Sequence, residues 1–101
     1  LQITGRTRDV CDNSPIDKKF AAFGWTVRCI DGHNFDELTS ALTDSPVKGL
    51  PTVVIANTVK GKGVSFMEDV VKWHHGVPSD AEYAQAMEEI DSHIQAQEIL
   101  L

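Results

Sequence analysis

Short runs of alternating or apolar residues along the chain predict β-strands. Leu1-Gln2-Ile3-Thr4 alternates apolar and polar residues and stops at Gly5, which indicates the end of a strand. Residues 25–30 are rich in aromatic and β-branched side chains and predict a second strand. Residues 52–56 form a near-continuous apolar run, which is typical of a strand covered on both faces in a parallel sheet. We therefore expect three strands, with 52–56 as the central one.

The segments between these strands have the spacing of amphipathic helices. The first predicted helix has Ser14 as its N-cap, Pro15 at its first position and Gly24 as its stop. The second begins after Asn34, which forms with Glu37 a pair of the capping-box kind. The stripes that we expect to be buried are Ile16, Phe20 and Phe23 in the first helix and Phe35, Leu38 and Leu42 in the second.

A third amphipathic helix follows a long loop at residues 57–78. Ser79 and Glu82 form its capping box, and it is predicted to run to about Gln95. Its apolar stripe is Tyr83, Met87, Ile90 and Ile94. The order strand, helix, strand, helix, strand has crossovers long enough for right-handed βαβ units, so the predicted fold is an α/β layered structure with a parallel sheet.

Composition narrows the class of protein. The chain has 101 residues, of which 42% are hydrophobic and 24% are charged, values close to those of a globular domain with one modest core. No apolar run approaches the roughly 20 residues that span a bilayer, so we expect no membrane segment. The first residue is Leu1 and no leader pattern follows, so we expect a fragment without a signal peptide. Two cysteines without metal-site or scaffold spacing favour reduced thiols and a cytoplasmic location.

The charge pattern argues against nucleic acid as a partner. Nine Lys and Arg residues against fifteen Asp and Glu residues give a formal net charge of −6. Residues 79–101 hold six of the acidic side chains and no Lys or Arg. Such a surface repels a phosphate backbone, and no basic stripe compensates for it.

The long loop carries the residues with candidate chemistry, because ligands of parallel α/β sheets bind beyond the carboxyl ends of the strands. Lys60-Gly61-Lys62-Gly63 is either a phosphate cradle or a solvated turn, and it lacks the spacing of a Walker A motif. His74 and His75 follow in the same loop, and adjacent side chains on an extended backbone point to opposite sides. We therefore expect one histidine to face a cleft as a proton donor or anion binder, or both to be structural, rather than a shared metal site.

Five blocks, in order, carry a family resemblance over the whole chain. They are Leu1-Gln2-Ile3-Thr4-Gly5, Phe23-Gly24-Trp25, Asp31-Gly32-His33-Asn34, the segment 58–68 around Lys60-Gly61-Lys62-Gly63, and Trp73-His74-His75-Gly76-Val77-Pro78. Together they resemble the second half of the amino-terminal, diphosphate-binding domain of transketolase, and most of all that of small transketolases split into two chains. The resemblance implies that residues 1–101 are the carboxy-terminal half of a thiamine diphosphate-binding domain with a parallel sheet and helices on both faces.

The resemblance also implies a cofactor site. The backbone carbonyl of Leu1 matches a ligand of Mg²⁺ or another divalent cation, and Ile3 matches the apolar residue that packs on the thiazolium ring. His75 matches the histidine of the family's His-Gly pair, which lies near the cofactor diphosphate and the reacting substrate. The other metal ligands belong to a motif upstream of Leu1, so we expect the chain alone to be inactive and without measurable cofactor affinity.

By this resemblance the intact enzyme moves a two-carbon ketol unit from a ketose to an aldose, as in the pentose phosphate reactions. The implied partners are sugar phosphates and a complementary carboxy-terminal half or subunit, which supplies the activating glutamate within a dimeric assembly. Two alternatives stay open: a fragment of an enzyme similar to 1-deoxyxylulose-5-phosphate synthase, and a non-catalytic remnant that acts as a subunit-pairing module.

Overall fold

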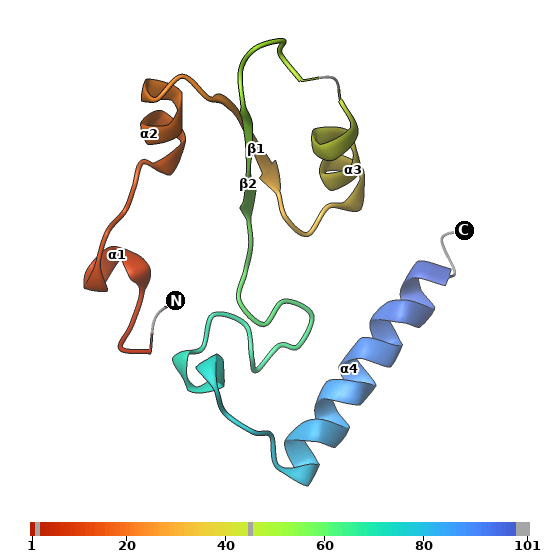
Figure 1. Ribbon diagram of the computed structural model, residues 1–101. Coiled ribbons are helices and arrows are strands. Elements are labelled where there is room, and N and C mark those ends of the chain that lie inside the picture. Colours follow the sequence, from red (N-terminus) through yellow and green to blue (C-terminus); the bar gives the residue numbers. More distant parts are fainter. Residues whose placement is uncertain (2, 45, 99–101) are drawn as a thin grey trace. The chain divides into compact units, whose positions relative to one another are not determined.

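The computed structural model of the chain describes residues 1, 3–44 and 46–98 and divides into two compact units. The strand unit is Cys11–Thr58, and the loop–helix unit combines Leu1–Val10 with Val59–Leu101. Figure 1 shows the elements along the chain. They are α1 (Thr7–Val10), α2 (Ile16–Ala22), β1 (Thr26–Asp31), α3 (Phe35–Thr43), β2 (Thr52–Asn57), the 3₁₀ helix η1 (Val71–His74) and α4 (Asp80–Glu98).

The two strands of the strand unit confirm the predicted parallel pairing. β1 and β2 run parallel in a register from Thr26 opposite Thr52 to Asp31 opposite Asn57. Helix α3 connects them, so β1, α3 and β2 form one βαβ unit. The side chains of β2 are half-buried or exposed, so the prediction that this strand is covered on both faces is wrong for the residues described.

Helices lie on both sides of this sheet, as the α/β class predicts. Neighbouring residues of a strand point to opposite faces. On one face Arg28 and Ile30 line a pocket together with Ala41 of α3. On the other face Cys29 and Ile55 line a pocket with the residues at the start of α2. Figure 1 shows α2 and α3 on opposite sides of the strands, in agreement with this alternation.

The cap of α3 forms as predicted and also connects the helix to β1. The Asn34 side chain accepts hydrogen bonds from the backbone N–H groups of Asp36 (3.0 Å) and Glu37 (3.2 Å). The Glu37 carboxylate accepts the backbone N–H of Asp31 at 2.8 Å, at the end of β1. The pair therefore fixes the turn between the strand and the helix as well as the first turn of α3.

The predicted end of α2 is confirmed, but its predicted N-cap is wrong. Ser14 is not the N-cap, because its hydroxyl donates to the Asp12 carboxylate at 2.6 Å and Pro15 stands at the cap position without a side-chain cap. Gly24 does end the helix: it has a φ of +83°, and its N–H donates to the carbonyl of Ala21 at 3.0 Å. The local competition of Asp12 for the Ser14 hydroxyl explains the wrong N-cap.

The strand predicted at the start of the chain is absent from the described residues. Ile3 and Thr4 form a turn, and Gln2 lies outside the described residues. The carbonyl of Arg6 then accepts the N–H groups of Asp9 (2.9 Å) and Val10 (3.1 Å), which starts α1. An alternation of four residues is too short to distinguish a strand from a turn.

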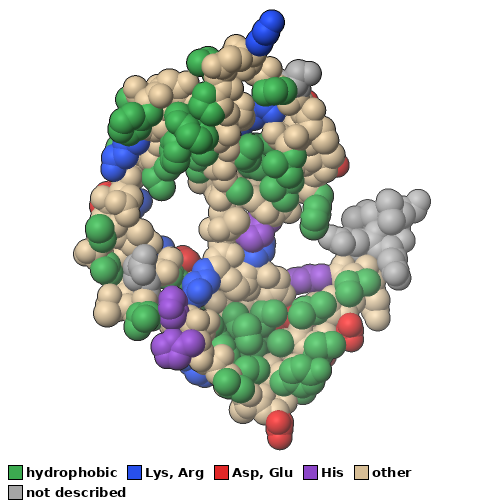
Figure 2. Space-filling view, in the orientation of Figure 1, with side chains coloured by type: hydrophobic (Ala, Val, Ile, Leu, Met, Phe, Trp, Pro, Cys, Tyr) green, Lys and Arg blue, Asp and Glu red, His purple; other side chains and the backbone are tan. Residues whose placement is uncertain are grey.

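The described residues bury little apolar surface. Their buried hydrophobic side chains are Ala41, Val64 and Ala86. Phe35 is 82% exposed and Leu42 is 73% exposed, so the stripe predicted for α3 is not buried as a whole. The stripe of α4 is exposed too, and hydrophobic side chains lie at the surface of both units in Figure 2. The patterns identify apolar faces, but two strands and short helices are too small to cover them. No described helix is long and apolar enough to cross a membrane.

Candidate functional site

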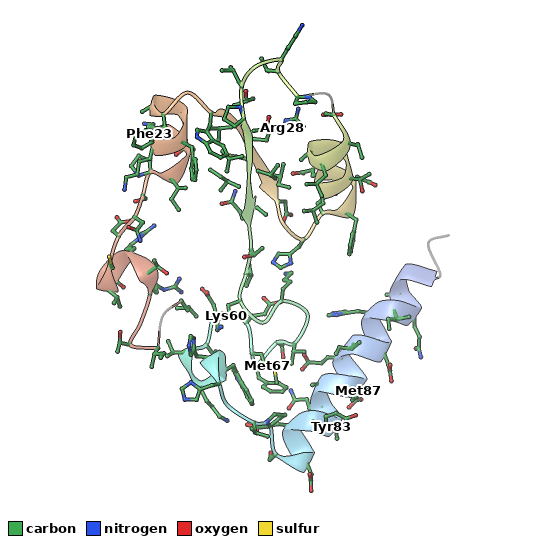
Figure 3. All side chains as sticks on the ribbon, in the orientation of Figure 1. Phe23, Arg28, Lys60, Met67, Tyr83 and Met87 are labelled. Atoms are coloured by element: carbon green, nitrogen blue, oxygen red, sulfur yellow. The ribbon has the colours of Figure 1, made fainter. Side chains whose placement is uncertain are left out.

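The loop after β2 is closed by backbone contacts that require a glycine. The N–H of Asp69 donates to the carbonyl of Lys60 at 2.9 Å, so the two ends of the loop meet. Gly61 has a φ of +73°, and a Cβ there would stand 2.5 Å from the carbonyl oxygen of Met67. Figure 3 labels Lys60 and Met67 within this loop. Gly61 therefore serves the close approach of two backbone segments.

The rest of the Gly/Lys segment is occupied by a carboxylate of the same loop. Glu68 accepts the backbone N–H of Gly63 at 3.1 Å, and the Lys62 ammonium lies 3.5 Å from the same carboxylate oxygen. The Glu68 carboxylate thus already binds the Gly63 N–H and the Lys62 ammonium, the groups with which this segment would bind a phosphate. Of the two interpretations, this geometry favours the turn over the phosphate cradle, and the turn is held by contacts within the loop rather than only by solvent.

The loop is joined to α4 through Glu89. The backbone N–H of Ser65 donates to this carboxylate at 2.6 Å, and the Ser65 hydroxyl donates to its other oxygen at 2.8 Å. Gln85, one turn earlier in α4, donates at 2.9 Å. These bonds, chiefly the one from the Ser65 backbone, lower the pKa of Glu89 below its ordinary value. The carboxylate therefore connects the loop to α4 as an anion.

The start of α4 has the predicted capping box and one additional cation. The Ser79 N–H and hydroxyl both donate to Glu82, at 2.8 and 2.9 Å, and the Glu82 N–H donates back to the Ser79 hydroxyl at 3.3 Å. The Lys72 ammonium of η1 donates to Glu82 at 2.7 Å. These contacts, with the Lys72 hydrogen bond as the largest cause, lower the pKa of Glu82 to about 2. The helix runs to Glu98, slightly beyond the predicted end.

The 3₁₀ helix η1 places His75 at its C-terminal end. The indole N–H of Trp73 donates to the carbonyl of Phe66 at 3.1 Å, and the two rings meet edge to face at 5.5 Å. A Cβ on Gly76 would stand 2.8 Å from the carbonyl oxygen of Lys72. Trp73 and Gly76 therefore hold the turn on either side of His75, which occupies the C-cap of η1 and is exposed.

The two histidines are not arranged as the sequence predicted. Their ring centroids lie 5.6 Å apart at an interplanar angle of 83°, so the rings contact each other edge to face. The expectation of side chains on opposite sides is wrong because His74 ends a 3₁₀ helix and is not in an extended segment. A change at His74 therefore also affects the surroundings of His75.

The segment that carries Leu1 lies against the far end of the loop. Leu1 lines a cavity of about 380 Å³ together with Arg6, Thr7, Arg8 and Asp69. The Arg6 guanidinium and the Asp69 carboxylate form an ion pair at 2.7 Å. Ile3 is 58% exposed, and neither Ile3 nor His75 lines this cavity. The structure thus brings Leu1 to the loop that leads into η1. Ile3 and His75 belong to the same unit, and their side chains are exposed to solvent.

Several contacts of the site were not predicted from the sequence. The partners in the Arg6–Asp69 and Ser65–Glu89 contacts are 63 and 24 positions apart, and no local pattern marks either pair. Among the described residues, no group of three or more His, Cys, Asp or Glu side chains could hold a metal ion.

Comparison with known proteins places the chain in a family. The family model described as transketolase, thiamine diphosphate binding domain, matches residues 1–96. The chain is 42% identical over 90 residues to one of the subunits of apulose-4-phosphate transketolase from Actinobacillus succinogenes, covering 89% of this chain and 33% of that protein. It is 37% identical over 92 residues to a 6-deoxy-6-sulfo-D-fructose transketolase subunit of Clostridium sp., covering 90% of this chain and 34% of that protein.

A longer relative matches the same segment. The chain is 40% identical over 85 residues to transketolase of Homo sapiens, covering 83% of this chain and 13% of that protein. The chain thus spans about a third of the length of the relatives that are transketolase subunits. Because the family match extends from the first residue almost to the last, the chain belongs to the family of transketolase thiamine diphosphate-binding domains.

Proposed function

We propose that this chain is the carboxy-terminal half, residues 1–101, of the diphosphate-binding domain of a split transketolase. The enzyme moves a two-carbon ketol unit from a ketose to an aldose. The observation that carries the proposal is the family match over residues 1–96, together with relatives that are named as single subunits of transketolases. Those names favour transketolase over a synthase of the 1-deoxyxylulose type.

The three positions proposed for the cofactor are accessible to a ligand. Leu1 lines a cavity, Ile3 is more than half exposed, and His75 is exposed at the end of η1. An uncovered apolar side chain can pack on the face of an aromatic ring, and an uncovered imidazole can donate a hydrogen bond to a diphosphate. We therefore assign thiamine diphosphate to Ile3 and His75, and a divalent cation such as Mg²⁺ to the carbonyl of Leu1, with its other ligands from outside this chain.

The residues of this chain have distinct roles in the proposed reaction. Bound thiamine diphosphate supplies the nucleophilic carbon and the electron sink for cleavage of the carbon–carbon bond. Ile3 packs on the thiazolium ring and excludes water from it. The imidazole of His75 holds the diphosphate or moves a proton on a substrate oxygen, and its exposed position at the C-cap of η1 allows either contact. The carbonyl of Leu1 would hold the divalent cation, together with ligands from outside this chain.

The proposal requires a second polypeptide and an acidic sugar. The partner is a complementary carboxy-terminal subunit that supplies the activating glutamate in a dimeric, cytoplasmic assembly. Two relatives are named for apulose 4-phosphate and for 6-deoxy-6-sulfo-D-fructose, sugars that carry a phosphate or a sulfonate. We therefore propose a sugar bearing such an anionic group, first of all a sugar phosphate, as the substrate.

Substitution of His75 tests this assignment. In the full protein assembled with its complementary subunit, we expect His75→Ala to lower turnover by roughly 10²-fold, as for loss of a general acid–base group. The Mg²⁺ concentration for half-maximal activity should stay the same, because His75 is not a metal ligand.

His74→Ala is the matched control. It removes the ring that contacts His75 but leaves the His75 imidazole itself in place, so it should cost much less activity than His75→Ala. Equal, small losses in both variants would show that the two histidines are structural, and wild-type protein without ketol transfer would refute the proposed function itself.

A further inference from the structure

An ion pair joins the segment that carries Leu1 and Ile3 to the long loop. The Arg6 Nη2 lies 2.7 Å from the Asp69 Oδ2. The backbone of Arg6 is fixed at the same place, because its carbonyl accepts the first N–H groups of α1, from Asp9 and Val10. Arg6 therefore marks the point where the turn at Ile3 ends and α1 begins.

The other partner, Asp69, is held by its own backbone. Its φ is +61°, a left-handed conformation that Asp and Asn tolerate better than most other residues. Its N–H closes the loop onto the carbonyl of Lys60 at 2.9 Å. This closure anchors the backbone of Asp69, so the ion pair connects Arg6 to an anchored point of the loop.

Asp69 directly precedes η1. Val70 is the N-cap of that helix, and His75 is its C-cap. A short, anchored helix thus leads from the Arg6 contact to His75, while Leu1 and Ile3 lie a few residues before Arg6 in the chain. The Arg6–Asp69 pair therefore joins the two chain segments that carry the residues assigned to the cofactor.

We propose that Arg6 and Asp69 are positioning residues for thiamine diphosphate. Their ion pair fixes the distance between the segment of Leu1 and Ile3 and the helix η1, so that the metal, the thiazolium ring and the diphosphate are held at the same time. This inference rests on the proposed function. Neither side chain touches the cofactor itself.

The exposure of the pair limits the size of the effect. The side chains of Arg6 and Asp69 are 62% and 46% exposed. Exposed ion pairs contribute little, and we expect the loss of this one to weaken cofactor binding by about two- to fivefold. Because the charges are open to solvent, high salt should remove much of the difference between wild type and variants.

The test is calorimetric titration of thiamine diphosphate, at saturating Mg²⁺, into the full protein assembled with its complementary subunit. The variants are Arg6→Ala and Asp69→Asn, the latter because Asn keeps the left-handed backbone and removes the charge. Each should raise the Kd by about two- to fivefold, and the double variant should be no worse than either single one.

Lys62→Ala is the matched control, because it breaks another exposed ion pair of the same loop, with Glu68, and leaves Arg6 in place. It should leave the Kd unchanged. Three results would overturn the inference: additive losses in the double variant, an equal loss with Lys62→Ala, or a lowered Tm with an unchanged Kd. Wild-type protein that binds no thiamine diphosphate would instead refute the proposed function, and the inference with it.

Discussion

Gly61 and Gly63 offer a matched pair of substitutions for the loop that supports the site. Both have a positive φ, +73° and +100°, so alanine at either position costs about 1–2 kcal/mol of backbone strain. The two differ in the space available: a Cβ at Gly61 would stand 2.5 Å from the carbonyl oxygen of Met67, whereas a Cβ at Gly63 meets nothing within 4 Å. Relief of that overlap costs about another 1–3 kcal/mol. We expect Gly63→Ala to destabilise by about 1–2 and Gly61→Ala by about 2–5 kcal/mol.

Urea unfolding of the full chain measures this difference. Tryptophan fluorescence reports the unfolding, and the 101-residue chain has two tryptophans. In a Trp25→Phe background the signal comes from Trp73, whose indole N–H donates to the carbonyl of Phe66 in the same loop. The urea midpoint should fall further for Gly61→Ala than for Gly63→Ala, with the same dependence of the free energy on urea in both variants. Equal shifts, or a smaller shift for Gly61→Ala, would show that the close approach to Met67 does not determine the need for glycine.

Three further predictions follow from the same unit. Gly76→Ala places a Cβ 2.8 Å from the carbonyl oxygen of Lys72, so it should displace His75 and lower turnover of the assembled enzyme by roughly 10-fold or more in steady-state kinetics, without changing any reacting group. The pKa of Glu82 is about 2 in the folded chain against an ordinary value of 4.5, so its stabilisation of the start of α4 is complete above pH 4.5 and is lost as the pH falls towards 2. Circular dichroism should show this acid loss of helix in wild type, and a Glu82→Gln variant with the same acid transition would contradict it. Calorimetric titration of the 101-residue chain alone with thiamine diphosphate and Mg²⁺ should show no saturable binding, and a micromolar Kd would mean that the site is misassigned.

Features determined by neighbouring residues were predictable from the sequence. The Ser79–Glu82 cap, the Asn34 cap and the stop at Gly24 depend on partners within a few positions, so a short motif identifies them. The parallel pairing follows from the strand, helix, strand order, because strands joined by a helical crossover pair in parallel.

Other features depend on contacts that no local pattern reveals. The first strand was wrongly predicted because its alternation covers four residues, and the chain turns into α1 at Arg6. The stripe of α3 was identified as apolar, but whether Phe35 and Leu42 are covered depends on surfaces that pack against the helix. The Arg6–Asp69 pair joins residues 63 positions apart, and only the folded structure shows it.

The two-stranded sheet has a consequence for assembly. In the described residues β1 and β2 pair with each other, so each has one edge with N–H and C=O groups that no strand bonds. Parallel sheets occur almost only in α/β proteins that cover both faces, and sheets usually have about four to six strands. The strand unit is therefore a template onto which further strands can add on both sides. A polypeptide that supplies such strands would pair with these edges and stabilise the strand unit.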